Sequence, residues 1–127
     1  PDSIGLILPV VSPDGHYLAS STADGRKLKL YDFNTRTWLE LTPPGVGFTD
    51  WSADSRDLYF DTGLSKDPAI YQLRIADRKM KQVVSLKDFR RVVMGHTPWM
   101  GITPEGSPLL TRDMGTQEVY ALDFEDQ

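Results

Sequence analysis

The stretch Ser12-Pro13-Asp14-Gly15 (SPDG) decides the fold, because it returns twice in altered form. SADS stands at 52–55 and TPEG at 103–106. Serine or threonine at the first position accepts a local hydrogen bond, proline presets φ for a type I turn, and glycine closes it. Each copy is therefore predicted to be a tight turn between two strands. The copies begin 40 and then 51 residues apart (52 − 12 and 103 − 52), close to the length of a four-stranded propeller blade.

A second anchor follows each turn at a constant distance. Alternating, strand-like runs end at Phe33, Ile75 and Phe124, which lie 21, 23 and 21 residues after the first position of each turn. The second unit therefore carries two extra residues. The connection between the second and third units is nine residues longer than the one before it, since 103 − 75 is 28 and 52 − 33 is 19. This predicts an inserted loop within 86–99.

The repeat predicts an all-β fold of three β-propeller blades, half of a six-bladed ring. The expected blades cover 1–45, 46–90 and 91–127, and the third lacks its outer strand because the sequence stops at Gln127. The expected strands are 6–11, 16–21, 27–33, 37–42, 46–51, 57–62, 69–75, 79–86, 99–102, 108–112 and 117–124.

Composition argues against several function classes. The 18 acidic and 14 basic residues are scattered and give a net charge of −4, so no basic footprint for direct nucleic-acid binding is present. The longest apolar run, 4–11, is too short to span a bilayer. Without cysteine the chain has no disulfides or thiolate metal sites, and its compartment stays open. With no initiator methionine and no signal peptide, the sequence is expected to be a fragment of a longer protein.

Known catalytic motifs are missing from the sequence. It has no G-x-S-x-G elbow, no H-E-x-x-H and no glycine-rich phosphate loop, so we predict a chain that is not an enzyme and needs no cofactor. Asp14, Asp54 and Glu105 are interpreted as turn formers and not as calcium ligands, because no unit alternates oxygen-bearing side chains densely. No metal site is expected. Of the two histidines, His16 flanks a turn and is assigned a structural or solvent role.

The inserted loop holds the candidate ligand-binding residues Arg90, Arg91, His96 and Trp99. Inserted loops on rigid β scaffolds often carry binding residues. The two guanidinium groups are suited to a carboxylate or phosphate, with Trp99 as a stacking wall. The alternative interpretation is that Trp99 packs between blades and the arginines are solvated. Trp38 and Trp51 are expected to be packing residues.

Three stretches carry a resemblance to a known family. The W-S-x-D-x stretch at 51–55, the SPDG turn and the I-Y-x-L-x-I-x-D-R-K run at 70–79 resemble the TolB-like propeller repeat. The ending at 106–122 resembles the C-terminal end of large bacterial proteins that couple such a propeller to a winged-helix or kinase domain. The sequence departs from the repeat where Val11 and Ile102 replace tryptophan and where Ser55 replaces glycine.

The resemblance implies a non-catalytic interaction or ligand-sensing scaffold, periplasmic or cytoplasmic, in a bacterium. The alternative is the accessory propeller of a hydrolase or peptidase whose catalytic domain lies outside this chain. Expected partners are an unknown protein or a small anionic ligand. The flat apolar faces of the outer blades also need cover, either from upstream blades of the parent protein or from a second copy in a homodimer that closes a six-bladed ring.

Overall fold

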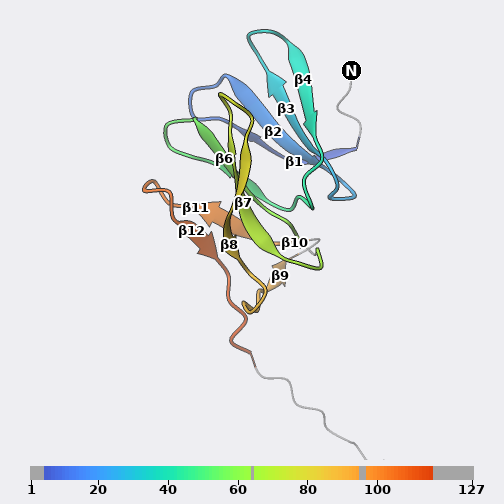
Figure 1. The fold of residues 1–127 in the computed structure, drawn as a ribbon, viewed down its shortest axis with the longest axis vertical. Coiled ribbons are helices and arrows are strands. Elements are labelled where there is room, and N and C mark those ends of the chain that lie inside the picture. The colour runs from blue at the N-terminus through green and yellow to red at the C-terminus, as the bar shows by residue number, and fades with distance from the viewer. Residues whose placement is uncertain (1–4, 64, 95–96, 116–127) are drawn as a thin grey trace, which may run out of the picture.

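The computed structural model of the chain describes residues 5–63, 65–94 and 97–115, and in these residues all regular structure is β-strand. The first four strands form one antiparallel sheet in chain order, called blade one here: β1 (Leu6–Val11), β2 (Tyr17–Thr22), β3 (Leu28–Asp32) and β4 (Thr37–Leu41). The next four form blade two in the same way: β5 (Thr49–Trp51), β6 (Asp57–Asp61), β7 (Ala69–Arg74) and β8 (Met80–Ser85). The two blades lie one against the other (Figure 1).

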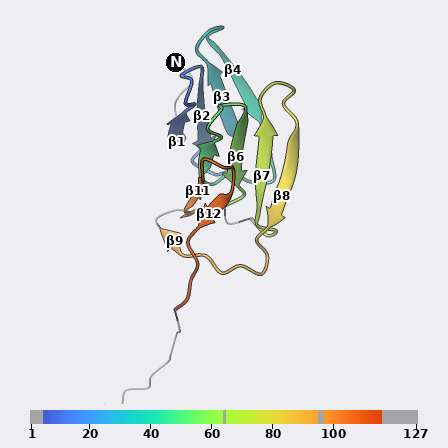
Figure 2. The same ribbon diagram turned by 90° about the vertical axis from the view of Figure 1, so that its left-hand side faces the viewer.

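Two smaller pairs of strands follow blade two. β11 (Met100–Ile102) and β12 (Pro108–Leu110) form an antiparallel pair, called the third sheet here. β9 (Val93–Met94) pairs with β10 (Thr97–Pro98) inside the predicted insertion. Figure 2 shows the third sheet in front of blade two.

The predicted all-β fold is confirmed, and the expected strands agree closely with the observed ones. The largest difference is the strand expected at 46–51, which begins only at Thr49; before it, the Val46 N–H donates to Gly25 in the turn between β2 and β3, away from blade two. β9 and β10 were not predicted. The expected strand 117–124 lies outside the described residues.

The repeated turn has the geometry that its sequence predicts. The Ser12 hydroxyl donates to the Asp14 carboxylate at 2.6 Å and accepts from the Tyr17 N–H at 3.0 Å. The Ser52 hydroxyl makes the same two bonds, to Asp54 at 2.7 Å and from Asp57 at 3.0 Å. The third turn is one residue shorter, because there the hydroxyl of the first residue accepts from the fourth residue after it and not from the fifth.

Sequence reasoning missed a further copy of this turn between β2 and β3. In TADG at 22–25, the Thr22 hydroxyl donates to Asp24 at 2.5 Å and accepts from the Lys27 N–H at 3.1 Å. The corresponding residue of blade two, Thr62, accepts from the Ala69 N–H at 3.0 Å. The turn spans five residues in blade one and seven in blade two, so the two extra residues of unit two lie here.

The first hydrophobic core lies between the two blades. Blade one contributes Ala19, Leu28 and Leu30, and blade two contributes Leu58, Phe60 and Leu73, together with Val46 and Trp51. The Trp51 indole N–H donates to the Val10 carbonyl at 3.0 Å, and its ring stacks on Tyr17. Trp51 is 5% exposed, so it is a packing residue as expected.

A second core joins blade two to the third sheet. It consists of Tyr59, Ile70, Leu86 and Met100, with Phe48, Phe89, Ile102 and Leu110 around them. The Asp50 carboxylate accepts the Ile102 N–H at 2.9 Å, so strand β5 holds β11 through a side chain.

Candidate functional site

Three connections meet at one end of the two blades and form what we call the loop face. They are the β2–β3 turn at 22–27, the β4–β5 connection at 42–48 and the β6–β7 connection at 62–68. The Val46 N–H donates to the Gly25 carbonyl at 2.8 Å, and the Gly47 N–H donates to the Asp61 carbonyl at 2.8 Å. The β4–β5 connection is therefore bonded to the β2–β3 turn of blade one and to the last residue of β6 in blade two, which fixes it relative to both blades.

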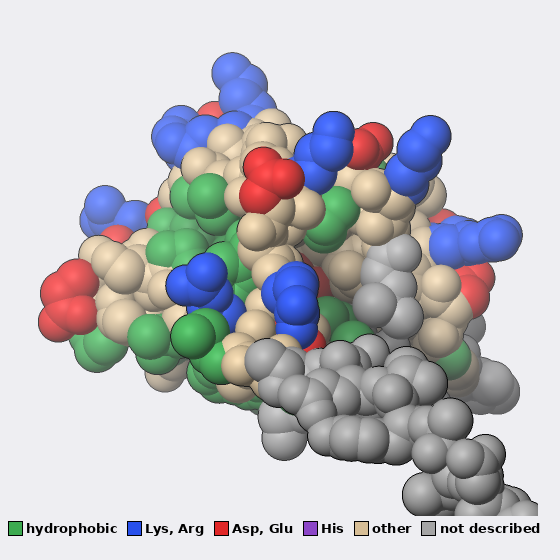
Figure 3. All heavy atoms as spheres, turned by 90° about the horizontal axis from the view of Figure 1, so that it is seen from below, with side chains coloured by type: hydrophobic (Ala, Val, Ile, Leu, Met, Phe, Trp, Pro, Cys, Tyr) green, Lys and Arg blue, Asp and Glu red, His purple; other side chains and the backbone are tan. Residues whose placement is uncertain are grey.

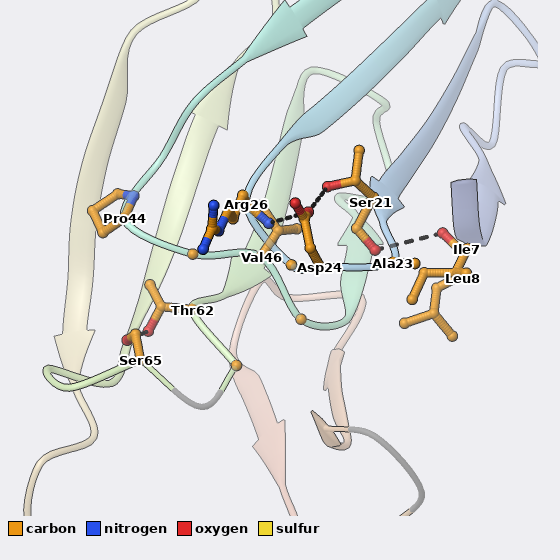
Figure 4. A pocket seen from close by; sticks show the side chains of 15 residues that line it. Ile7, Leu8, Ser21, Ala23, Asp24, Arg26, Pro44, Val46, Thr62 and Ser65 are labelled. Atoms are coloured by element: carbon orange, nitrogen blue, oxygen red, sulfur yellow. Dashed lines mark hydrogen bonds between the residues drawn. The ribbon is translucent and has the colours of Figure 1, made fainter. Parts of the chain in front are cut away.

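A cleft of about 330 Å³ opens on this face between the blades. Its apolar lining comes from the start of β1 and from the β4–β5 connection, as Ile7, Leu8, Pro44 and Val46. Its polar lining comes from the two other loops, as Thr22, Asp24, Arg26, Thr62 and Ser65 (Figure 4). Apolar walls with a few polar groups are typical of binding sites, and the volume lies in the range of small-ligand pockets.

The cleft is closely packed at its base. A Cβ placed on Gly45 would lie 2.5 Å from the Thr62 carbonyl oxygen, so only glycine fits at this crossing. The Ser65 hydroxyl donates to the Thr62 hydroxyl at 2.8 Å. The two connections are therefore held in contact beneath the open space.

Backbone strain occurs beside the cleft at Leu8. Its φ is 54°, a left-handed value that side chains rarely adopt, and it lies in a bulge where the β1–β2 register shifts between Ile7 and Val10. The bulge is held because the Ile7 carbonyl accepts the Ser20 hydroxyl at 2.7 Å. Strain of this kind is concentrated at functional sites in proteins.

The charged groups of the cleft are solvent-exposed. The hydrogen bond from the Thr22 hydroxyl, followed by that from the Arg26 N–H, holds the pKa of Asp24 below its usual value, so this carboxylate is ionised at neutral pH. The Arg26 side chain is exposed at the same turn. The cleft therefore offers one anion and one cation to a ligand.

The predicted binding residue Arg91 is instead buried beside the loop face. Its side chain is 5% exposed and lies 3.5 Å from the carboxylate of Asp61, which is fully buried. The guanidinium also donates to the carbonyls of Pro98 and Trp99 at 3.2 and 3.0 Å. Burial raises the pKa of Asp61, and the nearby Arg91 opposes that rise. These contacts fix the inserted loop onto blade two.

Of the other predicted residues, the structure describes Arg90 and Trp99. Arg90 points to solvent and donates to the Asp113 carboxylate at 3.1 Å and to the Gly115 carbonyl at 3.0 Å. Trp99 is 38% exposed. His96 lies outside the described residues, so the binding role of this set stays a prediction.

Within 5–63, 65–94 and 97–115, no three histidine or acidic side chains come together in a way that would hold a metal ion. In the same residues no helix is long and apolar enough to cross a membrane.

Comparison with known proteins identifies the architecture. Neither a protein-family model nor a curated protein matches the chain. The structure is similar to TolB from Acinetobacter baumannii, with a TM-score of 0.59 and 21% identity over 80% of this chain. It is also similar to hydrazine synthase from Kuenenia stuttgartiensis, with a TM-score of 0.57 and 20% identity over 84% of this chain. The fold is that of a β-propeller segment.

The segment spans 25% of the matched TolB chain and 28% of the matched hydrazine synthase chain. At this level of identity the similarity shows the fold alone. Two complete blades of the propeller segment are described, and the third sheet takes the place of the expected third blade with two strands.

The cleft of the propeller segment was not predicted from the sequence. The signal that would have found it is the TADG turn at 22–25, which repeats the S/T-x-D-G pattern ten residues after the first turn. Recognising both turns of blade one would have placed one of them at each end of the sheet. The loops that line the cleft would then have been grouped on one face.

Proposed function

We propose that this chain is a non-catalytic propeller segment that binds a partner polypeptide on its loop face. The observation that carries the proposal is the cleft between the blades, where the β4–β5 connection is bonded by Val46 to the β2–β3 turn and by Gly47 to the end of β6. A site held rigidly in advance loses little conformational freedom when a ligand binds. The propeller fold of the similar structures is consistent with a scaffold of this kind.

The lining favours a peptide ligand. Leu8 and Pro44 offer apolar contact, whereas Ser65 offers a hydroxyl oxygen from the opposite blade. A polypeptide presents both kinds of group along its length, so it matches such a mixed surface. The exposed guanidinium of Arg26 is suited to an acidic group on the partner.

Two equivalent alanines give a matched test. Ala23 and Ala53 are both exposed and both stand second in an S/T-x-D turn, but only Ala23 lines the cleft. A tryptophan at position 23 would fill the cleft, and the same change at position 53 would leave it open. We expect peptides selected from a displayed random library on the wild-type chain to lose about tenfold or more in affinity for Ala23→Trp.

The same peptides should bind Ala53→Trp as they bind the wild type, with equal melting temperatures for both variants. Isothermal titration of the selected peptides measures the affinities. Equal binding to the two variants, or a library that yields no binding peptide, would contradict the proposal.

A further inference from the structure

On the face that packs against blade one, blade two has a row of neighbours that crosses all four of its strands. We call it the docking row of blade two: Trp51, Leu58, Leu73 and Met80. Trp51 is 5% exposed, and Leu58 and Leu73 are fully buried in the core between the blades. Three members of this row therefore take part in the contact with the blade before it, and the fourth, Met80, is 39% exposed at its end.

Blade one meets that surface with a row of its own. We call it the receiving row of blade one: Val10, Ala19, Leu30 and Leu39. All four side chains belong to the core between the blades. The Val10 carbonyl accepts the indole N–H of Trp51, and the Ser55 hydroxyl accepts the Asp14 N–H at 3.0 Å. The contact between the two rows is therefore both apolar and hydrogen-bonded.

The repeat gives blade one a docking row as well. Its members are Val11, Leu18, Tyr31 and Trp38, which pair in register across the sheet. They precede their counterparts in blade two by 40, 40, 42 and 42 residues, as the two-residue insertion after β6 requires. Neighbouring positions on a strand point to opposite faces, so this row lies on the face away from blade two. Val11 is 53% exposed.

In the third sheet, two residues stand at the positions of the first two members of a receiving row. Gly101 pairs with Leu109 immediately beside the Ile102–Pro108 pair, as Val10 pairs with Ala19 beside Val11 and Leu18. Leu109 is 47% exposed and Trp99 is 38% exposed. A Cβ on Gly101 would lie 2.8 Å from the Trp99 ring, which therefore adds apolar surface to this row. In Figure 3, which views the molecule from below, hydrophobic side chains are interspersed with basic and acidic ones.

We propose that two copies of this chain associate head to tail, each placing the docking row of its blade one on the receiving row of its partner's third sheet. The two surfaces repeat a pair of surfaces that is already buried within one chain. An exposed apolar patch on a soluble protein marks an interface. A closed head-to-tail dimer covers both rows of both copies, whereas a dimer through identical faces would leave one row of each copy uncovered.

The contact between copies is smaller than the contact between blades. Val11 stands where blade two has Trp51, so the indole and its hydrogen bond are missing. Beside the row, Glu40 lies 2.6 Å from Lys27 and 3.6 Å from Lys29, and this charged group stays at the solvent edge. We therefore expect association at micromolar concentration.

Opposite charges placed in the two rows test the arrangement. Val11→Lys and Leu109→Glu each disrupt one row, so each variant alone should sediment as a monomer of 14.3 kDa at a concentration at which the wild type has twice that mass. Mixed in equal amounts, they form one wild-type contact and one contact between the introduced lysine and glutamate. The mixture should therefore recover the dimer mass.

Val83→Lys is the matched control. Val83 is 42% exposed on β8 and belongs to neither row, so this variant should dimerise like the wild type. Circular dichroism should show the same strand content and melting temperature in both single variants measured at monomer concentration. A wild type that stays monomeric at about 100 µM, or a mixture that stays monomeric, would overturn the proposal.

Discussion

Ser55 holds a backbone conformation that side chains seldom adopt, with φ at 61°. It replaces the glycine found at this position in the first turn. The structure gives a reason, because the Ser55 hydroxyl accepts the Asp14 N–H of blade one and joins the two turns. Glycine would relieve strain of about 1 kcal/mol, and the hydrogen bond contributes a similar amount.

We therefore expect Ser55→Gly to leave the free energy of unfolding nearly unchanged. Ser55→Ala keeps the strained conformation and loses the bond, so it should cost about 1–2 kcal/mol. Urea denaturation of both variants measures the difference. If Ser55→Ala were as stable as the wild type, the bond between the turns would contribute nothing to stability.

Arg91 and Asp61 form a buried ion pair, so removing the arginine should be costly. Arg91→Met leaves an uncompensated carboxylate in the interior and should destabilise the chain by about 3–5 kcal/mol. Arg90→Met changes an exposed side chain and should stay within about 0.5 kcal/mol. Chemical denaturation at neutral pH measures the free energy of unfolding of the two variants. Equal small effects would show that Arg91 is not held in the interior.

The cost of Arg91→Met should depend on pH. Burial raises the folded-state pKa of Asp61 above its ordinary value of 3.8, and removing the guanidinium raises it further. Above 3.8 the folded state then binds more protons than the unfolded state, so stability falls as pH rises through the folded pKa. The destabilisation should therefore shrink as pH is lowered from 7 towards about 4. A cost that is independent of pH would contradict this account.

Where the β4–β5 connection crosses the β6–β7 connection, the backbones leave no room for a side chain on Gly45. Gly45→Ala places a Cβ 2.5 Å from the Thr62 carbonyl oxygen, which belongs to the backbone and cannot rotate away. We expect a loss of about 1–3 kcal/mol, as for other overpacked sites. Pro44→Ala, at an exposed neighbouring position, is the control. Equal melting temperatures for the two variants would show that the loops separate freely.

The strands and first turns could be predicted because their signals are local. A hydroxyl residue, an acid and a glycine at fixed spacing specify the turn at 12–15, and alternation specifies the strands beside it. The same pattern at 22–25 was overlooked because only one turn was sought in each unit. The contact of Arg91 with Asp61 joins residues 30 positions apart in sequence, and nothing near Arg91 distinguishes a buried arginine from a solvated one. The cleft likewise depends on three separated loops.

At the scale of the whole molecule, two cores lie on opposite faces of blade two. Trp51 belongs to the core shared with blade one, and Met100 belongs to the core shared with the third sheet. Trp51→Ala should therefore lower the stability of both blades, by about 3–5 kcal/mol. Met100→Ala should loosen the third sheet and leave blade one intact.

Amide hydrogen exchange distinguishes these outcomes, because it reports the opening of each region separately. With Met100→Ala, the amides of β11 and β12 should lose protection while those of β2 and β3 keep it. Equal loss of protection in all sheets would mean that the molecule unfolds as a single cooperative unit.

The connectivity of the blades bears on synthesis in the cell. Each strand of a blade pairs only with its neighbours in the chain, and blade one is complete at Leu41. As the chain leaves the ribosome at about 5–20 residues per second, blade one has all its hydrogen-bonding partners before blade two has been translated. Blade one, which emerges before blade two, then presents a finished surface on which blade two can assemble, so the order of translation is also the order in which these two blades can fold.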